Sequence, residues 1–383
     1  MAYHGKTGVL IVNLGTPDSP TRYDVYRYLR EFLTDRRVID YPWVARQALV
    51  QGVIAPLRSG SSAKLYRDLW TEDGSPLKVY GESLVAQVAP LLGDEYLVRL
   101  AMRYQSPSIE DTVRELLAQD IDRLVVFSLF PQYASATVGS VHDEVMRVLR
   151  AEENVPELVL LRDYYDHPAL VGCFADNARA FALDGYDHVL FSFHGLPERQ
   201  LRKADRHAHC TKADHCCSSI GRVNQYCYSA QCHATAQAIA RELGLHDDAR
   251  PNHDQPAYSI CFQSRLGPEK WAQPYTSDVI KARRERGDTK LLVLCPAFTA
   301  DCLETVIEIS DEYKEEFEEM GGEVLDLVPS LNDMPAWVAA VAQIVRRAAP
   351  PRVSSPRGHG EDAHRSPQAD QDAGVLADLP PAR

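Results

Sequence analysis

Short runs of apolar residues, many of them β-branched, alternate along the chain with longer stretches of helical periodicity. The runs have the length of a strand and contain few polar positions, which is typical of strands covered on both faces of a parallel sheet. The stretches between them place apolar residues three and four positions apart, as in helices that cover such a sheet. We expect strands at residues 8–14, 96–102, 124–129, 158–161, 188–193, 258–262, 291–294 and 324–327.

This alternation of strand and helix occurs in two similar halves, and it predicts an α/β fold with two mostly parallel sheets of about four strands each. We expect an N-terminal domain over residues 1–163 and a C-terminal domain over residues 164–330. A last helix within residues 331–348 is expected to pack back across the first domain. Residues 349–383 are rich in Pro, Ser and charged residues and are expected to be disordered.

The composition of the chain argues against some classes of function. The chain of 383 residues carries a net charge of -13, with 54 acidic residues and no basic stripe, so we expect no nucleic-acid partner. It contains no apolar run of membrane-spanning length and no signal peptide, which favours a cytoplasmic location. Residues 38–57 are apolar but interrupted by Pro and Gly. Two interpretations stay open, an exposed lip that contacts a bilayer or a flat hydrophobic ligand, and a packed helical hairpin.

Chemically distinctive side chains gather where the expected strands end. His194 follows the strand at residues 188–193 and is itself followed by Gly195, so the imidazole is expected at the carboxyl edge of the sheet, where open α/β sheets bind ligands. A capping or core histidine is the alternative. After the strand at 124–129, small hydroxyl residues and Tyr133 leave room for a flat ligand, although such hydroxyls also cap helices.

Two further strand ends carry polar groups. Gln263 and Trp271 follow the strand at 258–262. Beyond the strand at 291–294, a helix would place Glu304, Glu308 and Glu312 on one face, because their spacing is i, i+4 and i+8. Such a stripe is either a solvated face or a path for a divalent cation, which prefers hard oxygen ligands.

Five of the nine cysteines lie in a polar insert at residues 207–233, which also contains several histidines. In a cytoplasmic chain this density indicates a soft metal, either zinc or an iron-sulfur cluster, rather than disulfides. Ordinary buried thiols are the alternative. The five are Cys210, Cys216, Cys217, Cys227 and Cys232.

Taken together, the four strand-end stretches resemble the ferrochelatases, which insert Fe(II) into a porphyrin to make haem. The motifs, in order, are Pro-Gln-Tyr at 131–133, Ser-Phe-His-Gly-Leu-Pro at 192–197, Gln-Ser-Arg-Leu-Gly-Pro at 263–268 and the acidic stretch at 301–304. The resemblance runs from about residue 8 to residue 337. It implies two Rossmann-like domains with the porphyrin between them and an apolar mouth at residues 38–57.

By this resemblance, His194 and Glu304 form the catalytic pair across the porphyrin, with His194 contacting metal and removing pyrrole protons and Glu308 on the iron path. Leu14, where relatives that use coproporphyrin commonly have Tyr, favours the protoporphyrin branch. Cys302 stands where many relatives have His. The porphyrin-binding positions implied are Arg103, Tyr104, Tyr133, Gln263 and Trp271.

Some bacterial ferrochelatases hold a 2Fe-2S cluster with four cysteines of an internal segment, and the cysteine insert resembles theirs. We expect Cys210, Cys217, Cys227 and Cys232 as its ligands, with Cys216 as the alternative. The predicted activity is insertion of Fe(II) into protoporphyrin IX to form protohaem, the last step of haem biosynthesis. The alternatives are coproporphyrin III as substrate and a non-catalytic tetrapyrrole carrier or iron sensor. Peripheral contact with the inner membrane through residues 38–57 is expected, and a homodimer is left open.

Overall fold

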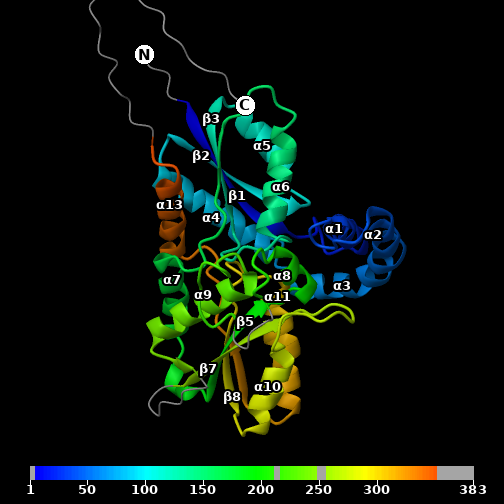
Figure 1. Ribbon diagram of the computed structural model, residues 1–383, viewed down its shortest axis with the longest axis vertical. Coiled ribbons are helices and arrows are strands. Elements are labelled where there is room, and N and C mark those ends of the chain that lie inside the picture. Colours follow the sequence, from blue (N-terminus) through cyan, green and yellow to red (C-terminus); the bar gives the residue numbers. More distant parts are fainter. Residues whose placement is uncertain (1–4, 211–215, 248–255, 352–383) are drawn as a thin grey trace, which may run out of the picture. The chain divides into compact units, whose positions relative to one another are not determined.

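Two parallel β-sheets form the framework of the computed structural model, which describes residues 5–210, 216–247 and 256–351 (Figure 1). The first sheet has the strand order β2-β1-β3-β4. Its core strand β1 is buried along almost its whole length, as the uninterrupted apolar run predicts. The strands are β1 (Lys6–Gly15), β2 (Tyr96–Tyr104), β3 (Ile121–Ser128) and β4 (Glu157–Leu160).

The second sheet has the strand order β6-β7-β5-β8-β9. Every ladder in both sheets is parallel, so the predicted α/β class is confirmed. The one strand that the apolar pattern did not predict is β6, a two-residue edge strand too short to carry a pattern. The strands are β5 (His188–His194), β6 (His246–Asp247), β7 (Ala257–Gln263), β8 (Lys290–Leu294) and β9 (Val324–Leu327).

Helices connect the strands and cover the sheets. The α5 helix shows why they form where they do. Ser108 caps its N-terminus by accepting from the Asp111 N–H, and Ile109, Val113 and Leu116 form its buried face. The helices are α1 (Arg22–Thr34), α2 (Trp43–Leu49), α3 (Ala55–Leu69), α4 (Pro76–Leu92), α5 (Ile109–Leu117), α6 (Val138–Leu149), α7 (Pro168–Arg179), α8 (Glu198–Ala204), α9 (Tyr228–Leu243), α10 (Thr276–Glu285), α11 (Leu303–Val306), α12 (Lys314–Glu319) and α13 (Pro335–Ala348), with a 3-10 turn, η2, at Leu183–Gly185.

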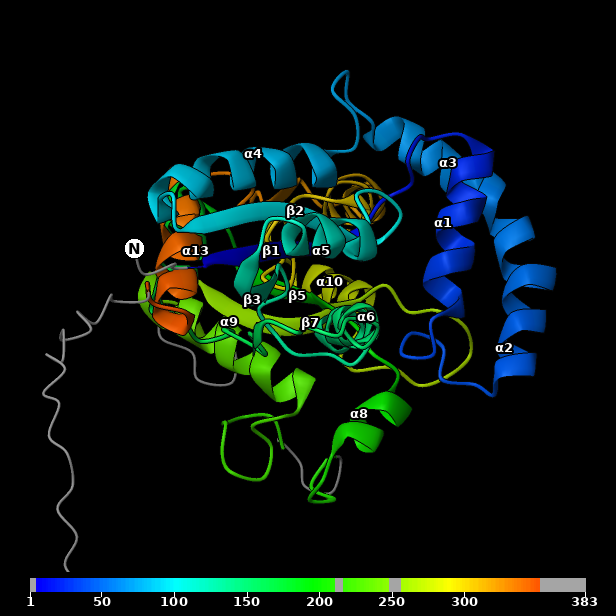
Figure 2. The same cartoon turned by 90° about the horizontal axis from the view of Figure 1, so that it is seen from above.

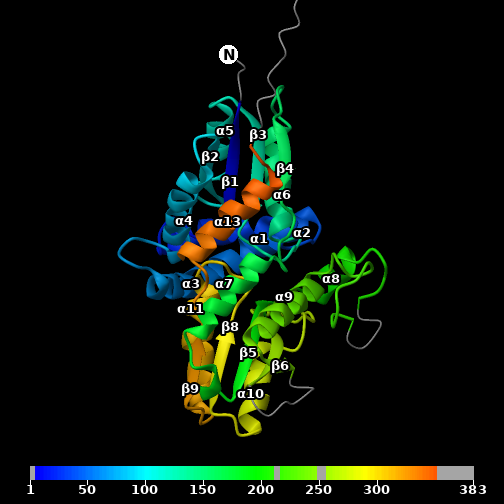
Figure 3. The same ribbon diagram turned by 90° about the vertical axis from the view of Figure 1, so that its left-hand side faces the viewer.

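The last helix, α13, packs against α4 and α7 (Figure 3). Its Trp337 is fully buried, and its ring lies 6.2 Å from that of Tyr164 and 6.5 Å from that of Phe127. Residues 5–351 form one compact unit, so both sheets share hydrophobic contacts through this helix. The domain limits expected from the sequence stay predictions, and all of the expected disordered tail beyond residue 351 lies outside the described residues.

Residues 38–57 are mostly helical. Here α2 continues through a π-helical turn, η1 (Val50–Ile54), into α3, and the α1 to α3 region stands beside the sheets rather than against their faces (Figure 2). Trp43, Val44 and Leu57 expose 67%, 70% and 75% of their surface. Residues 43–57 thus belong to one continuous helical run rather than to a hairpin, and apolar side chains on it stay exposed as the lip interpretation requires. Within the described residues, no helix is both long enough and apolar enough to cross a membrane.

Candidate active site

His194 is the last residue of β5, and it pairs in register with Gln263 at the end of β7. Its Nδ1 lies 2.7 Å from the carbonyl oxygen of Gly195. A carbonyl only accepts, so Nδ1 carries a proton and the neutral ring keeps its lone pair on Nε2. Nε2 has no hydrogen-bond partner among the residues that the structure describes. The half-buried ring therefore offers a base at the carboxyl edge of the sheet.

Two aromatic rings flank this imidazole. The ring centroids of Trp271 and Phe298 lie 6.2 Å and 6.4 Å from that of His194. Trp271 is held in place because its indole N–H donates to the carbonyl of Leu266 at 3.0 Å and its backbone bridges to Pro197. The surroundings of His194 are thus apolar on two sides, which limits access of water to a proton on Nε2.

Gln263 is the link between the His194 strand and the acidic segment. Its side chain is 2% exposed and fully bonded. The amide oxygen accepts from the Ser192 hydroxyl at 2.7 Å, and the amide nitrogen donates to the Glu304 carbonyl at 2.7 Å. The structure therefore brings His194 and Glu304 to the same neighbour, although they are 110 residues apart. The amide of Gln263 thus has its hydrogen bonds within the protein, and its predicted contact with the porphyrin stays a prediction.

Glu304 lies in α11, beside hydroxyl and thiol groups. Burial, followed by the negative charge of Glu304, raises the pKa of Tyr66, which comes from α3. Burial and the same carboxylate also raise the pKa of the Cys302 thiol. No salt bridge to Glu304 occurs within the described part of the chain. The neighbours named above, a phenol and a thiol, carry no positive charge that would neutralise this half-buried carboxylate.

Glu308 has a different environment. The segment after α11 is not the single α-helix that the i, i+4, i+8 spacing assumes, because residues Glu308–Tyr313 form a π-helical turn, η3. Its carboxylate accepts from the Ser264 N–H at 2.9 Å, the Ser264 hydroxyl at 2.5 Å, the Gln263 amide at 3.2 Å and the Tyr313 hydroxyl at 3.1 Å. These bonds hold Ser264 at a φ of 65°, a strained conformation for a side chain other than glycine.

Arg103 and Tyr104 end β2 and face a carboxylate of their own. The Arg103 guanidinium lies 2.7 Å and the Tyr104 hydroxyl 2.9 Å from the same oxygen of Asp35, and the Ser140 hydroxyl donates to that oxygen as well. Tyr104 is completely buried. Burial opposes the charge of Asp35, but hydrogen bonds from Ser140 and the Arg37 N–H, with the charge of Arg103, outweigh it and lower the pKa of that carboxyl. The two predicted porphyrin contacts thus belong to a closed network.

Tyr133 lies in the loop that follows β3 and is half-buried. Its backbone N–H donates to the Gln231 side chain of α9 at 2.8 Å. The guanidinium of Arg162 lies 4.5 Å from the centre of its ring, which is a cation–π contact. One face of Tyr133 is therefore occupied by a cation.

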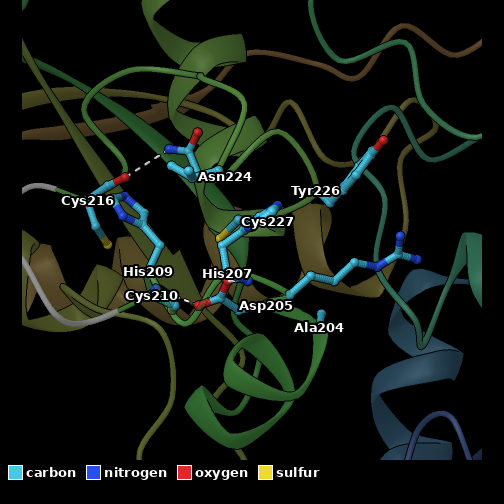
Figure 4. A pocket seen from close by; sticks show the side chains of 11 residues that line it. Ala204, Asp205, His207, His209, Cys210, Cys216, Asn224, Tyr226 and Cys227 are labelled. Atoms are coloured by element: carbon cyan, nitrogen blue, oxygen red, sulfur yellow. Dashed lines mark hydrogen bonds between the residues drawn. The ribbon is translucent and has the colours of Figure 1, made fainter.

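The cysteine insert brings Cys210, Cys216, Cys217 and Cys227 together near the N-terminus of α9, and Figure 4 shows three of them, Cys210, Cys216 and Cys227. Cys227 is the N-cap residue of this helix. Hydrogen bonds from the thiols of Cys210 and Cys217 lower the pKa of Cys227 far below the ordinary value, against the effect of burial. The sulfur of Cys216 lies 3.7 Å from that of Cys217. Thiolate at a helix N-terminus is the form that binds soft metals.

Cys232 differs from the gathered thiols in its surroundings. It faces the hydrophobic core and is completely buried, and burial raises its pKa well above the ordinary value, where the nearby Tyr228 hydroxyl acts against it. In the described residues no three His, Cys, Asp or Glu side chains are arranged as a finished metal site. The insert thus supplies the ligand atoms that a soft metal prefers, without the converging geometry of a formed metal site in the described residues.

A family model described as Ferrochelatase matches residues 6–349. The chain belongs to the ferrochelatase family. Among curated ferrochelatases, that of Legionella pneumophila (strain Lens) is 41% identical over 342 residues, which are 89% of this chain and 98% of the relative. That of Coxiella burnetii (strain CbuK_Q154) is 41% identical over 350 residues, which are 90% and 94% of the two chains. The family assignment therefore covers both sheets.

A solved structure supports the fold of this ferrochelatase-family chain independently. SirB from Bacillus subtilis with Fe3+ superposes with a TM-score of 0.50 at 12% sequence identity, covering 90% of this chain and 96% of SirB. At that identity the likeness concerns the fold alone.

Sequence reasoning missed the residues that surround the expected site residues. Tyr28 and Tyr66 stand in helices α1 and α3 of the first half, and Asp35 is the C-cap residue of α1, all of them far along the chain from any predicted motif. The Tyr28 and Tyr66 rings lie 6.1 Å apart, and Glu304 raises the pKa of both hydroxyls in addition to burial. A run of tyrosines in an otherwise polar helix was the only local signal, and it does not say which carboxylate they approach.

Proposed function

We propose that this chain is an enzyme that inserts Fe(II) into protoporphyrin IX to form protohaem, the last step of haem biosynthesis. The observation that carries the proposal is the state of His194. Its Nδ1 proton is committed to a backbone carbonyl, and its Nε2 lone pair has no partner among the described residues. Membership of the ferrochelatase family identifies the reaction in which such a base is required.

The reaction removes two pyrrole protons while one dication enters the macrocycle. Nε2 of His194 accepts the two protons one after the other and releases the first to solvent before it takes the second. Each time, the imidazolium is stabilised because Nδ1 continues to donate to the Gly195 carbonyl. Trp271 and Phe298 shield the ring from water on two sides.

Glu304 supplies the negative charge. Its described neighbours are a thiol and two phenols rather than a cation, so the carboxylate attracts Fe(II) without enclosing it. Glu308 and the exposed Glu312 continue the acidic stripe outward, and burial with the charges of Glu308, Glu316 and Asp311 raises the pKa of Glu312. The Glu308 carboxylate already accepts four hydrogen bonds, so iron that binds it on the way inward replaces one of these donors.

We assign the porphyrin contacts from the exposed surface and the hydrogen bonds of each candidate side chain. Trp271 and Tyr133 keep part of their ring surface available, so we place them against the macrocycle. Arg103, Tyr104 and Gln263 are engaged in buried hydrogen bonds, so they support the walls and reach the substrate only if those bonds rearrange. Protoporphyrin, the more apolar of the two candidate substrates, suits the apolar surroundings of His194.

The cysteine insert fits a 2Fe-2S cluster by its chemistry, because four sulfurs gather at one helix N-terminus. We assign Cys210, Cys217 and Cys227 as ligands, as the sequence predicts, and Cys216 rather than Cys232 as the fourth. Cys232 is completely buried in the hydrophobic core, whereas the sulfur of Cys216 lies 3.7 Å from that of Cys217. Such a cluster, when bound, cross-links the insert and is able to exchange one electron.

Visible absorption of freshly purified protein tests this assignment. The spectrum of an iron-sulfur protein is expected, lost in Cys216→Ser and kept in Cys232→Ser. The reverse result restores Cys232 as the fourth ligand. A colourless sample that contains zinc rejects the iron-sulfur cluster.

The exposed apolar residues of α2 and α3 suit peripheral contact of a cytoplasmic enzyme with the inner membrane. Flotation with lipid vesicles tests this contact. Trp43→Glu combined with Leu57→Glu is expected to leave the protein in the dense fraction. Equal flotation of variant and wild type contradicts it.

Anaerobic fluorescence tests the activity. Protoporphyrin fluorescence is expected to fall continuously when Fe(II) is added to the wild-type chain, with haem as the product. A parallel assay with coproporphyrin III decides the substrate. A chain that binds protoporphyrin but does not consume it is a carrier and contradicts the proposal.

A further inference from the structure

The first turn of α9 connects the cysteine insert to His194. Cys227 caps this helix, and the next residue, Tyr228, donates its hydroxyl to the carbonyl oxygen of His194 at 2.9 Å. Tyr228 is 8% exposed. One residue beyond the gathered thiols, the chain therefore makes a direct, buried hydrogen bond to the backbone of the proposed base.

This hydrogen bond completes the anchoring of one peptide group. The carbonyl of the His194–Gly195 peptide accepts from Tyr228, and its N–H donates to the carbonyl of Gln263 at 2.9 Å. The imidazole in turn bonds the following carbonyl, that of Gly195. Rotation of this peptide therefore changes the direction of both the imidazole and its partner. Without the Tyr228 bond, only one side of the peptide is fixed.

The same turn holds the loop that carries Tyr133. Gln231 accepts from the Tyr133 N–H at 2.8 Å and donates to the Asp163 carboxylate at 3.1 Å. The Arg162 guanidinium lies 4.5 Å from the ring of Tyr133 and 4.3 Å from that of Tyr226, the residue before Cys227. In Figure 4, Tyr226 extends away from the cysteine side chains. Tyr228 and Gln231, which follow Cys227, thus contact parts of the candidate active site, and Tyr226, which precedes it, shares the Arg162 guanidinium with Tyr133.

We propose that Tyr228 is a positioning residue for His194, through which the state of the cysteine insert sets the rate of metal insertion. This inference rests on the proposed function. When Cys227 loses its bond to a metal, or its hydrogen bonds from Cys210 and Cys217, the start of α9 shifts. The shift reaches the His194 peptide because Tyr228, which bonds to that peptide, directly follows Cys227. A second route runs along the backbone from His194 through α8 to Asp205, which accepts from the Cys210 N–H at 2.7 Å. Only the α9 route depends on a single hydroxyl.

Tyr228→Phe removes that hydroxyl and keeps the ring. A typical intramolecular hydrogen bond contributes about 0.5–1.5 kcal/mol, and 1.4 kcal/mol corresponds to a tenfold change in rate, so we expect kcat to fall about three- to tenfold. The KM for protoporphyrin is expected to stay unchanged, because Tyr228 contacts the base rather than the substrate.

Tyr96→Phe is the matched control. Tyr96 is 5% exposed, and its hydroxyl also donates to a backbone carbonyl, that of Ala349, at 2.7 Å. Both variants are expected to lower the melting temperature, but only Tyr228→Phe lowers kcat. Equal kcat values for Tyr228→Phe and wild type, or equal losses in the two variants, overturn the positioning role.

A double-mutant cycle tests the connection to the cysteines. Cys227→Ser alone is expected to lower kcat, and the combination with Tyr228→Phe is expected to lower it no further than the stronger single variant. Independent, multiplying effects overturn the connection. If the Cys227→Ser chain does not fold, Cys217→Ser replaces it, since that thiol bonds to Cys227. A wild-type chain without insertion activity overturns the proposed function, whereas an active wild type with an unaffected Tyr228→Phe variant overturns this inference alone.

Discussion

The polar residues at the strand ends of the two sheets differ in whether their charged and hydrogen-bonding groups have partners. At the end of β2, Arg103 and Tyr104 converge with Ser140 on one oxygen of Asp35, so every charge has a partner. At the end of β5, His194 uses one ring nitrogen only, and Glu304 has neutral neighbours among the described residues. Both groups stand at the carboxyl edge of a parallel sheet beside aromatic rings.

The difference shows that a position at a strand end does not by itself make a residue reactive. A buried network in which every donor and acceptor is paired fixes the geometry of the fold. A half-buried base with a free lone pair beside a carboxylate without a cation is available for proton and metal transfer. Under the proposed function, the first sheet therefore provides a rigid wall, and the second provides the chemistry.

The largest expected effect comes from removing the base of the second sheet. His194→Ala is expected to lower the insertion rate by about 10²–10⁴-fold, the usual contribution of a general base, while protoporphyrin binding persists. Anaerobic fluorescence measures the rate, and fluorescence polarisation of the porphyrin measures binding. His167→Ala is the control, because His167 caps α7 by accepting from the Ala169 N–H. Comparable rates for His194→Ala and His167→Ala contradict the difference between the two strand ends.

In the first sheet, Asp35→Asn is expected to affect stability more than chemistry. It leaves Arg103, whose side chain is only 15% exposed, without its counter-charge, which costs about 3 kcal/mol of the free energy of unfolding. Urea unfolding measures this loss, and the insertion rate of the folded variant is expected to stay closer to wild type than that of His194→Ala. A rate loss as large as that of His194→Ala makes the Asp35 network part of the chemistry.

The pH dependence of the unfolding free energy tests the charge of Asp35 further. The pKa of Asp35 in the folded chain is lowered by its donors, against the effect of burial. Since the unfolded value is near 3.9, the carboxylate contributes stability above about pH 4 and loses it as the pH falls through the lowered folded value. The difference in unfolding free energy between wild type and Asp35→Asn is therefore expected to shrink below pH 4. A difference independent of pH contradicts the role of this charge.

The smallest effect is expected at an exposed pair of the same type. Asp40 pairs with Arg199 and Lys203 of α8, whose side chains are 42% and 68% exposed. Burial works against the charge of Asp40, but the two cations outweigh it and lower the pKa of that carboxyl. Asp40→Asn is expected to cost less than about 1 kcal/mol, because water and salt screen such pairs.

Urea unfolding with and without about 1 M salt, where the screening length is about 3 Å, checks this estimate. The difference between wild type and Asp40→Asn is expected to vanish in salt, whereas that of Asp35→Asn is expected to persist. Equal salt dependence at the two sites means that burial does not explain the contrast.

The sequence predicted much of this structure because its signals are local. Each strand predicted from an apolar run is present, because the composition of such a run already favours a buried strand. The glycine after His194 ends β5 at that histidine. The four strand-end motifs identified the family, which the family model matches over residues 6–349. The regular i, i+4 spacing of the glutamates did not predict the π-helical turn at Glu308, because the contacts to Ser264 come from another strand.

By itself, then, the sequence determined the two parallel sheets, the place of His194 at a strand end and the family. Only the tertiary structure decided which polar groups are paired. Asp35 meets Arg103 from 68 positions away, and Gln263 reaches the Glu304 carbonyl from 41 positions away. The physical reason is that backbone conformation responds to neighbouring residues, whereas a buried charge is compensated by whatever side chains the packing of distant elements brings to it.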